Sequence, residues 1–243
     1  MNLLLSCQDH VAKCLERQHR KIKIYFLQYF YHTIGLSKMD TTQIVKFDDR
    51  IEYHNDLGQL HRIDGPAIEY DNGSKEWYQN GQLHRIDGPA VEYDTGGKFW
   101  FQNDQLHRLD GPAEEWPDGS KFWYQNGQLH RLDGPAQEYA NGNKFWYQNG
   151  QKHRLDGPAV DWADGDKEWY QNGQKHRLDG PAEEYSNGGK FWFQNNQLHR
   201  LDGPALEEPN GYKEYYIHGC KYTELEFKFF SQAILGKYEN SKI

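Results

Sequence analysis

The chain has 243 residues, of which 36% are hydrophobic and 15% aromatic, and its formal net charge at pH 7 is −8. Residues 1–38 carry six basic and two acidic side chains, a sum of +4, so the rest of the chain holds −12. An acidic body argues against nucleic-acid binding, because contacts to phosphate require a positive surface.

The N-terminal segment, residues 1–43, lies outside any repeat and is predicted to be helical. Its apolar residues, such as Val11 and Leu15, are spaced loosely, as on helices. The repeat-like sequence begins just after Met39, so Met39 is an alternative to Met1 as the true start. We expect the basic part of this segment to pack on the first hairpins. A less favoured alternative places it on an anionic membrane surface.

Composition also bears on membranes and disulfides. The apolar and aromatic stretch 22–36 contains Lys23 and is shorter than the ~20 residues of a membrane-spanning helix, so we predict no transmembrane segment. The cysteines are odd in number, and two of the three lie in the N-terminal segment: Cys7, Cys14 and Cys220. This pattern is not a disulfide framework and indicates a reducing compartment.

Residues 44–222 are built from a repeat of 23 residues. The heptapeptide His-Arg-(Ile/Leu)-Asp-Gly-Pro-Ala occurs seven times, without insertion or deletion between copies. So strict a period predicts stacked supersecondary units, each contacting mainly its neighbours. Structural roles are predicted for four residues of each copy: His61, Asp64, Gly65, Pro66, His84, Asp87, Gly88, Pro89, His107, Asp110, Gly111, Pro112, His130, Asp133, Gly134, Pro135, His153, Asp156, Gly157, Pro158, His176, Asp179, Gly180, Pro181, His199, Asp202, Gly203 and Pro204.

Within the unit 66–87, the sequence predicts two strands and two turns. The segments 67–70 and 75–79 are predicted as strands, joined by a turn over residues 71–73. Asn80-Gly81 is predicted to close a second hairpin, because Asn-Gly between strands is the strongest short-range hairpin signal.

The turn residues of the other copies support these hairpins. The first turn has glycine in every copy, at Gly73, Gly96, Gly119, Gly142, Gly165, Gly188 and Gly211. The second turn has glycine in five copies, with Asp104 and Asn196 in the other two. Asp and Asn are the side chains that best tolerate a left-handed backbone, so both departures keep the predicted turn.

The C-terminal region, residues 223–243, departs from the repeat. Thr223 begins a Thr-x-x-Glu capping box, which predicts the start of a helix. Leu225, Phe229 and Ala233, with Phe230 as a further candidate, would share one face of that helix. We expect this face to cover the end of the sheet and hide an edge that otherwise pairs with another chain.

The unit resembles the MORN repeat over roughly residues 50–222. The shared features are the 23-residue period, an aromatic pair before Asn-Gly, and a His-Arg step followed by glycine and a further turn. The resemblance implies an elongated antiparallel sheet that acts as a scaffold or interaction module, and phosphoinositide or membrane binding is often proposed for the family. This chain has Asp-Gly-Pro-Ala where the family more commonly has Gly-x-Gly. The variant looks like those of bacterial and viral proteins, which implies the cytoplasm of a bacterial cell or of a virus-infected host.

The seven His-Arg-x-Asp sets invite a catalytic or metal-binding interpretation, since histidine beside a carboxylate is common at such sites. An active site, however, requires one asymmetric cluster, and units about 10 Å apart keep their imidazoles separate. We therefore predict no catalytic residue, metal ligand or cofactor, with anion binding as the alternative. Asp64 is expected to close its turn, Arg62 to pair with a carboxylate such as Glu69, and Lys75 to pair with Glu across strands.

Tryptophan recurs at one position of the second strand and forms the candidate interaction surface: Trp77, Trp100, Trp123, Trp146, Trp169 and Trp192. The following residue, Tyr or Phe, is expected on the opposite face, because strand side chains alternate. One aromatic row is expected to pack between units, while the other is either covered by Tyr70 and its equivalents or exposed to a ligand.

The predicted fold is therefore mainly β: an elongated antiparallel sheet of tandem β-hairpin repeats with a helical N-terminal segment and a C-terminal capping helix. The predicted function is a non-enzymatic scaffold whose partner is another protein. Two alternatives stay open, namely a ligand-binding aromatic repeat for glycan or choline-like groups and a membrane-recruited scaffold. Exposed tryptophans favour the first alternative, and fully buried ones argue against it.

Overall fold

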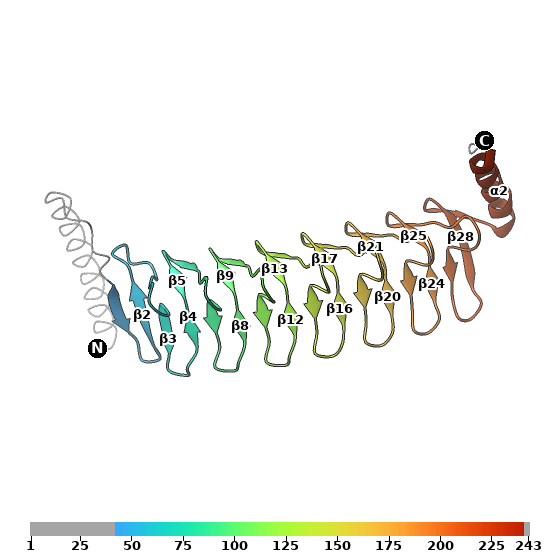
Figure 1. Cartoon of the computed structure of the whole chain (residues 1–243). Helices are drawn as coiled ribbons and strands as arrows, with labels where there is room; N and C mark the ends of the chain where they lie inside the picture. Colours follow the sequence, from blue (N-terminus) through green and yellow to red (C-terminus); the bar gives the residue numbers. More distant parts are fainter. Residues whose placement is uncertain (1–41, 241–243) are drawn as a thin grey trace, which may run out of the picture.

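A computed structural model describes residues 42–240. It shows a single file of β-hairpins that runs the length of the molecule and ends in one helix (Figure 1). The predicted mainly-β architecture of tandem hairpins is confirmed over these residues. The predicted N-terminal helix falls on residues 1–43, nearly all of which lie outside the described part of the chain.

A long antiparallel sheet of 17 strands forms one side of the file. Each strand pairs with the strands before and after it in this order: β1 (Gln43–Lys46), β2 (Arg50–His54), β3 (Ile68–Tyr70), β4 (Lys75–Glu76), β7 (Val91–Glu92), β8 (Lys98–Phe99), β11 (Glu114–Glu115), β12 (Lys121–Phe122), β15 (Gln137–Glu138), β16 (Lys144–Phe145), β19 (Val160–Asp161), β20 (Lys167–Glu168), β23 (Glu183–Glu184), β24 (Lys190–Phe191), β27 (Leu206–Glu207), β28 (Lys213–Ile217) and β29 (Cys220–Tyr222).

Short hairpins form a second row above this sheet (Figure 1). Each is a separate two-stranded sheet within one unit: β5 (Tyr78–Gln79) with β6 (Gln82–Leu83), β9 (Phe101–Gln102) with β10 (Gln105–Leu106), β13 (Tyr124–Gln125) with β14 (Gln128–Leu129), β17 (Tyr147–Gln148) with β18 (Gln151–Lys152), β21 (Tyr170–Gln171) with β22 (Gln174–Lys175), and β25 (Phe193–Gln194) with β26 (Gln197–Leu198).

The turns have the backbone geometry that the sequence predicts. Asn80 and Gly81 have φ of 52° and 82°, as a two-residue type I′ turn requires. Asp104 and Asn196 take φ of 63° and 64° in the place of glycine. At the first turn, Gly73 has φ of 94°, and its N–H donates to the carbonyl of Tyr70 at 2.9 Å. Both turn predictions are confirmed.

One predicted strand is divided. Residues 75–79 were expected to form a single strand, but Trp77 separates β4 from β5. Its N–H donates to the carbonyl of Ala90 in the next unit at 2.7 Å, while its carbonyl accepts from the N–H of His84 at 3.0 Å. The chain therefore changes pairing partner at Trp77. Below it the strand belongs to the long sheet, and above it to the short hairpin.

The core is thin and regular. The alanine that ends each heptapeptide is fully buried in all seven copies, at Ala67, Ala90, Ala113, Ala136, Ala159, Ala182 and Ala205. In six copies its N–H pairs with the second strand of its own unit; that of Ala113, for example, donates to the carbonyl of Phe122 at 2.8 Å. A methyl side chain is thus enclosed where consecutive hairpins meet.

Aromatic rings and a few acids fill one face of the long sheet. Phe99 meets Trp116 edge to face at 5.1 Å between ring centroids. Where the equivalent of Phe99 is an acid, aromatic side chains donate hydrogen bonds to it, and Glu76 accepts from the hydroxyls of Tyr70 at 3.2 Å and Tyr78 at 2.9 Å. Burial and this carboxylate raise the pKa of Tyr78. In this unit the Tyr70 and Tyr78 hydroxyls meet at one carboxylate, so both side chains lie on the same side of the sheet.

Helix α2 (Glu224–Asn240) begins at the predicted capping box. The Glu226 carboxylate accepts from the Thr223 N–H at 2.9 Å, and the Thr223 hydroxyl oxygen accepts from the Glu226 N–H at 3.3 Å. The helix lies against β28 and β29, at the end of the sheet as expected.

The predicted buried face of α2 is wrong. Leu225 is 80% exposed and Phe229 72% exposed, whereas Phe227 is buried and stacks on Tyr215 at 4.9 Å between ring centroids. Phe227 and Ser231 point to the sheet instead. The predicted residues and the buried ones are both spaced by four, so helical periodicity alone did not separate the two faces.

Candidate functional site

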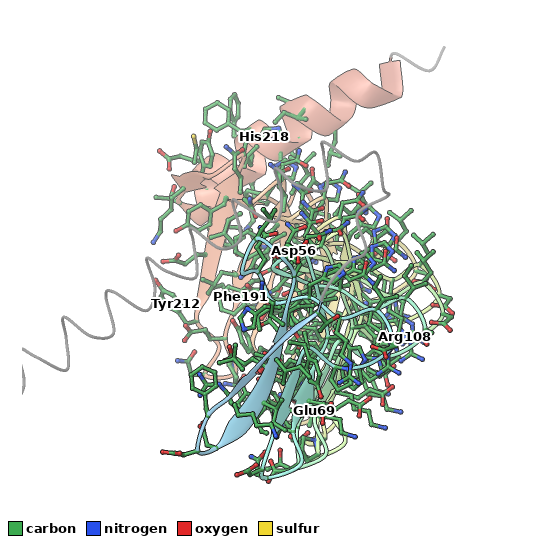
Figure 2. All side chains as sticks on the ribbon, turned by 90° about the vertical axis from the view of Figure 1, so that its left-hand side faces the viewer. Asp56, Glu69, Arg108, Phe191, Tyr212 and His218 are labelled. Atoms are coloured by element: carbon green, nitrogen blue, oxygen red, sulfur yellow. The ribbon has the colours of Figure 1, made fainter. Side chains whose placement is uncertain are left out.

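The heptapeptides form a row of loops along one side of the array, with an arginine at the centre of each. The Arg85 guanidinium carbon lies 4.1 Å from the centroid of the Trp77 ring. The same stacking occurs in the other six copies at 3.9–4.1 Å, with Tyr53 in place of tryptophan in the first. In the end-on view of Figure 2, Arg108 lies on one side of the array and Tyr212 on the other.

Hydrogen bonds hold each arginine in place. Arg85 Nε donates to Asp87 at 2.9 Å, and Nη1 donates to the Pro89 carbonyl at 3.2 Å and to Glu92 at 3.1 Å. The bonds to Asp and to the Pro carbonyl occur in all seven copies. Six copies also bind the Glu, and the exception is Arg154, whose counterpart is the shorter Asp161.

These contacts test three expectations about charged residues. The expected pairing of Arg62 with Glu69 is confirmed at 2.6 Å. Asp64 was expected to close its turn, and its carboxylate accepts a hydrogen bond from Arg62 Nε at 2.9 Å. The register places Lys75 opposite Glu69, as expected. The ion pair of Glu69, however, is with the partly buried Arg62, at 2.6 Å, rather than with lysine.

The glycine of each heptapeptide is required by this arginine. A Cβ atom on Gly88 would lie 2.7 Å from the guanidinium carbon of Arg85, and the distance is 2.7–2.9 Å in every copy. Since real Cβ contacts are not this short, a side chain here would displace the arginine from its ring. The glycine of Asp-Gly-Pro thus allows the loop backbone to lie close to the guanidinium.

The histidines join neighbouring units. His84 Nδ1 accepts from the N–H of Asn103, 19 residues later in the next short hairpin, at 3.3 Å. The equivalent bond occurs in all seven copies, at 3.0–3.3 Å. Within residues 42–240, no group of three or more His, Cys, Asp or Glu side chains is arranged to hold a metal ion. The histidines therefore have a structural contact in every unit.

The predicted tryptophan surface is half-buried. Trp77, Trp100, Trp123, Trp146, Trp169 and Trp192 all have intermediate exposure. A guanidinium covers one ring face of each. A sugar or a quaternary amine could stack on that face only by displacing the arginine and its hydrogen bonds.

Sequence reasoning missed the most exposed apolar residues of the loops. The third residue of the heptapeptide is Ile or Leu in every copy, and six of them are 75–79% exposed: Ile63, Ile86, Leu109, Leu132, Leu155 and Leu178. Each is followed by the heptapeptide Asp, whose side chain is 83–86% exposed in these copies. We call these six Ile/Leu–Asp pairs the loop edge. Its signal in the sequence was an apolar residue repeated inside a turn, where no strand or helix buries it.

Hollows lie between three of the five consecutive pairs in the loop edge. The one between Leu132 and Leu155 has a volume of 680 Å³ and is also lined by Trp146 and His153. Comparable hollows lie between Ile63 and Ile86, and between Leu155 and Leu178. At these three places a recess therefore lies between two exposed apolar side chains.

The acidic side chains of the loop edge are ionised at neutral pH. In six copies the neighbouring guanidinium holds the pKa of the heptapeptide Asp below its usual range: Asp64, Asp87, Asp110, Asp133, Asp156 and Asp179. The arginine side chains are only 20–24% exposed. A molecule approaching the edge therefore meets aliphatic groups and carboxylates first.

No protein-family model matches the chain, and no curated protein matches it significantly. The resemblance to MORN repeats therefore stays a prediction that rests on the repeat unit itself. Between residues 42 and 240, no helical segment has the length and apolar character needed to cross a membrane.

Proposed function

We propose that this chain is a non-enzymatic scaffold that binds another protein through its loop edge. The observation that carries the proposal is the row of six aliphatic side chains at 75–79% exposure. The other residues of the heptapeptide have contacts within the fold, so folding accounts for them. The exposed Ile or Leu has no such account, although it recurs in six of the seven copies.

The amount of exposed surface supports an interaction role. Fully burying a Leu or Ile stabilises by about 1.5–3 kcal/mol at about 25 cal/mol per Å², which corresponds to roughly 60–120 Å² per side chain. Six side chains, each about three-quarters exposed, then present roughly 300–500 Å² in one line. Patches of about this size on monomeric proteins are often functional.

The regular spacing also favours a scaffold over an enzyme. Each loop presents the same groups as the next, so the edge offers repeated equivalent contacts rather than one asymmetric catalytic cluster. The proposal includes a MORN-like identity for the repeat unit and a cytoplasmic location.

The proposal is tested by photocrosslinking in the native cell. A photoreactive residue at Leu132 is expected to crosslink a protein, and serine at Leu109 and Leu155 in the same chain is expected to abolish that crosslink. A photoreactive residue at Leu225, which is 80% exposed on α2, is the matched control. Equal crosslinking from both positions, or no dependence on the serine substitutions, would contradict the loop edge as the contact surface.

A further inference from the structure

We infer that the partner element of the loop edge is a basic amphipathic α-helix whose apolar residues recur every seven positions. This inference rests on the proposed function, since it names the partner of the same surface. It is carried by the pitch of the edge, by its charge and by the recesses between its side chains.

The pitch of the loop edge matches one heptad of an α-helix. Each unit adds two strands to the long sheet, so equivalent loop residues lie about 9.6 Å apart at about 4.8 Å per strand. Seven residues of an α-helix rise about 10.5 Å. A helix parallel to the array therefore drifts by about 1 Å per unit, which keeps apolar side chains in register over three or four units.

An extended strand matches less well. At about 3.3 Å per residue, three residues span one unit, and an odd number of residues places successive contacts on opposite faces of the strand. Every second unit would then meet the wrong face. The heptad helix keeps all contacts on one side.

The charge of the loop edge favours a basic helix. Each exposed Ile or Leu is followed by an exposed Asp whose carboxylate is ionised, while the arginine beneath is largely covered. Lys or Arg side chains flanking the apolar stripe of the helix would lie opposite these carboxylates. A second copy of this chain would bring the same acidic row against its own, which like-charge repulsion disfavours.

The recesses provide seats for the apolar residues of such a helix. The hollow between Leu132 and Leu155 has the Trp146 ring on its wall and a volume of 680 Å³, ample for one large aliphatic side chain. Hollows of 590 and 540 Å³ occur between two other pairs of loops. Apolar side chains of the helix would therefore lie in the hollows, between the exposed Ile or Leu side chains of the loop edge.

The test uses the full chain and a labelled synthetic peptide of about four heptads, stapled to be helical, with Leu every seven positions and Lys on both flanks. Fluorescence anisotropy is expected to show at least ten-fold tighter binding than for two peptides of matched helicity. One has the same composition with Leu spaced irregularly, and the other has Glu in place of Lys. Equal binding of the irregular peptide or of the Glu peptide would overturn the inference.

Variants of the chain locate the binding. Leu132→Ser with Leu155→Ser is expected to weaken binding of the heptad peptide at least ten-fold, whereas Leu225→Ser on α2 leaves it unchanged. Equal binding by both variants would place the contact elsewhere and overturn the inference. So would a dimer in sedimentation that the double substitution dissociates, because the occupant would then be a second copy. If the crosslink at Leu132 persists while no basic helix binds, the scaffold proposal stands and the helical partner is wrong.

Discussion

The row of heptapeptide loops and the long sheet differ in how strictly their residues are repeated from copy to copy. In the loops, six of the seven residues are identical in all copies. In the sheet, the position of Phe99 is held by Phe in four units and by Glu in the other three: Glu76, Glu168 and Glu214. Both regions stack at the same spacing, so the difference does not come from the period itself.

The difference reflects the kind of contact that each region makes. In the loops, an arginine must reach a ring, an Asp and a carbonyl at once, and Gly88 and Ala90 leave no space for larger side chains. In the sheet, cross-strand neighbours need only cover one another, so a ring or a hydroxyl-bonded acid suffices. Residues are thus identical between copies where several contacts must form at once. The exposed Ile or Leu makes no such contacts, so this reason does not explain why it recurs.

The largest effect is expected from Ala136→Leu, which forces a larger side chain into a fully buried site of the loop row. Overpacking should lower the free energy of unfolding by about 3 kcal/mol. Urea denaturation measures it, with Ala140→Leu, at an exposed turn, as the control expected to stay within about 0.5 kcal/mol. Equal effects at both sites would mean that the loops are not close-packed.

A smaller effect is expected from Arg131→Ala, which removes the stacking on Trp123 and the bonds to Asp133, Pro135 and Glu138. The loss should be about 2 kcal/mol, since the arginine is only partly exposed. Arg154→Ala, whose arginine lacks the Glu bond, should cost less by about 0.5–1 kcal/mol. Denaturation of both variants compares them, and a larger loss for Arg154 would contradict this assignment.

His199 is expected to make the free energy of unfolding depend on pH. Burial and the neighbouring His218 lower the pKa of His199 below its ordinary value of 6.5. The unfolded chain therefore binds a proton more readily than the folded one, so stability should be complete above pH 6.5 and fall as the pH drops below it. Urea denaturation at pH 8, 6.5 and 5 measures this loss, and His199→Gln should flatten the profile. A profile unchanged by that substitution would exclude His199 as its source.

The smallest effect on stability is expected from Leu132→Ser on the loop edge. Its side chain is 75% exposed, so the free energy of unfolding should change by less than about 0.5 kcal/mol. The half-buried Leu129 of β14 is the matched comparison, and Leu129→Ser should cost about 1 kcal/mol. A large loss for Leu132→Ser would mean that the loop edge serves folding rather than binding.

The sequence by itself determined the period, the hairpins and both turns. These features depend on chemistry within a few residues, such as the positive φ that Asn80-Gly81 tolerates, and seven copies repeat the same signal. The Arg62–Glu69 pair also followed from the residues. The structural role of the histidines stays a prediction, which rests on the identical sets in every unit and agrees with the backbone N–H that each imidazole accepts.

Only the tertiary structure decided what each unit presents to its neighbour and to solvent. The break at Trp77, the buried face of α2 and the cover of arginine over the tryptophans all depend on groups that local patterns do not place. The loop edge belongs here as well: an apolar residue in a turn is predicted to be buried or exposed only when the position of the next unit is known. Periodicity describes one element at a time, whereas exposure is set by the packing between elements.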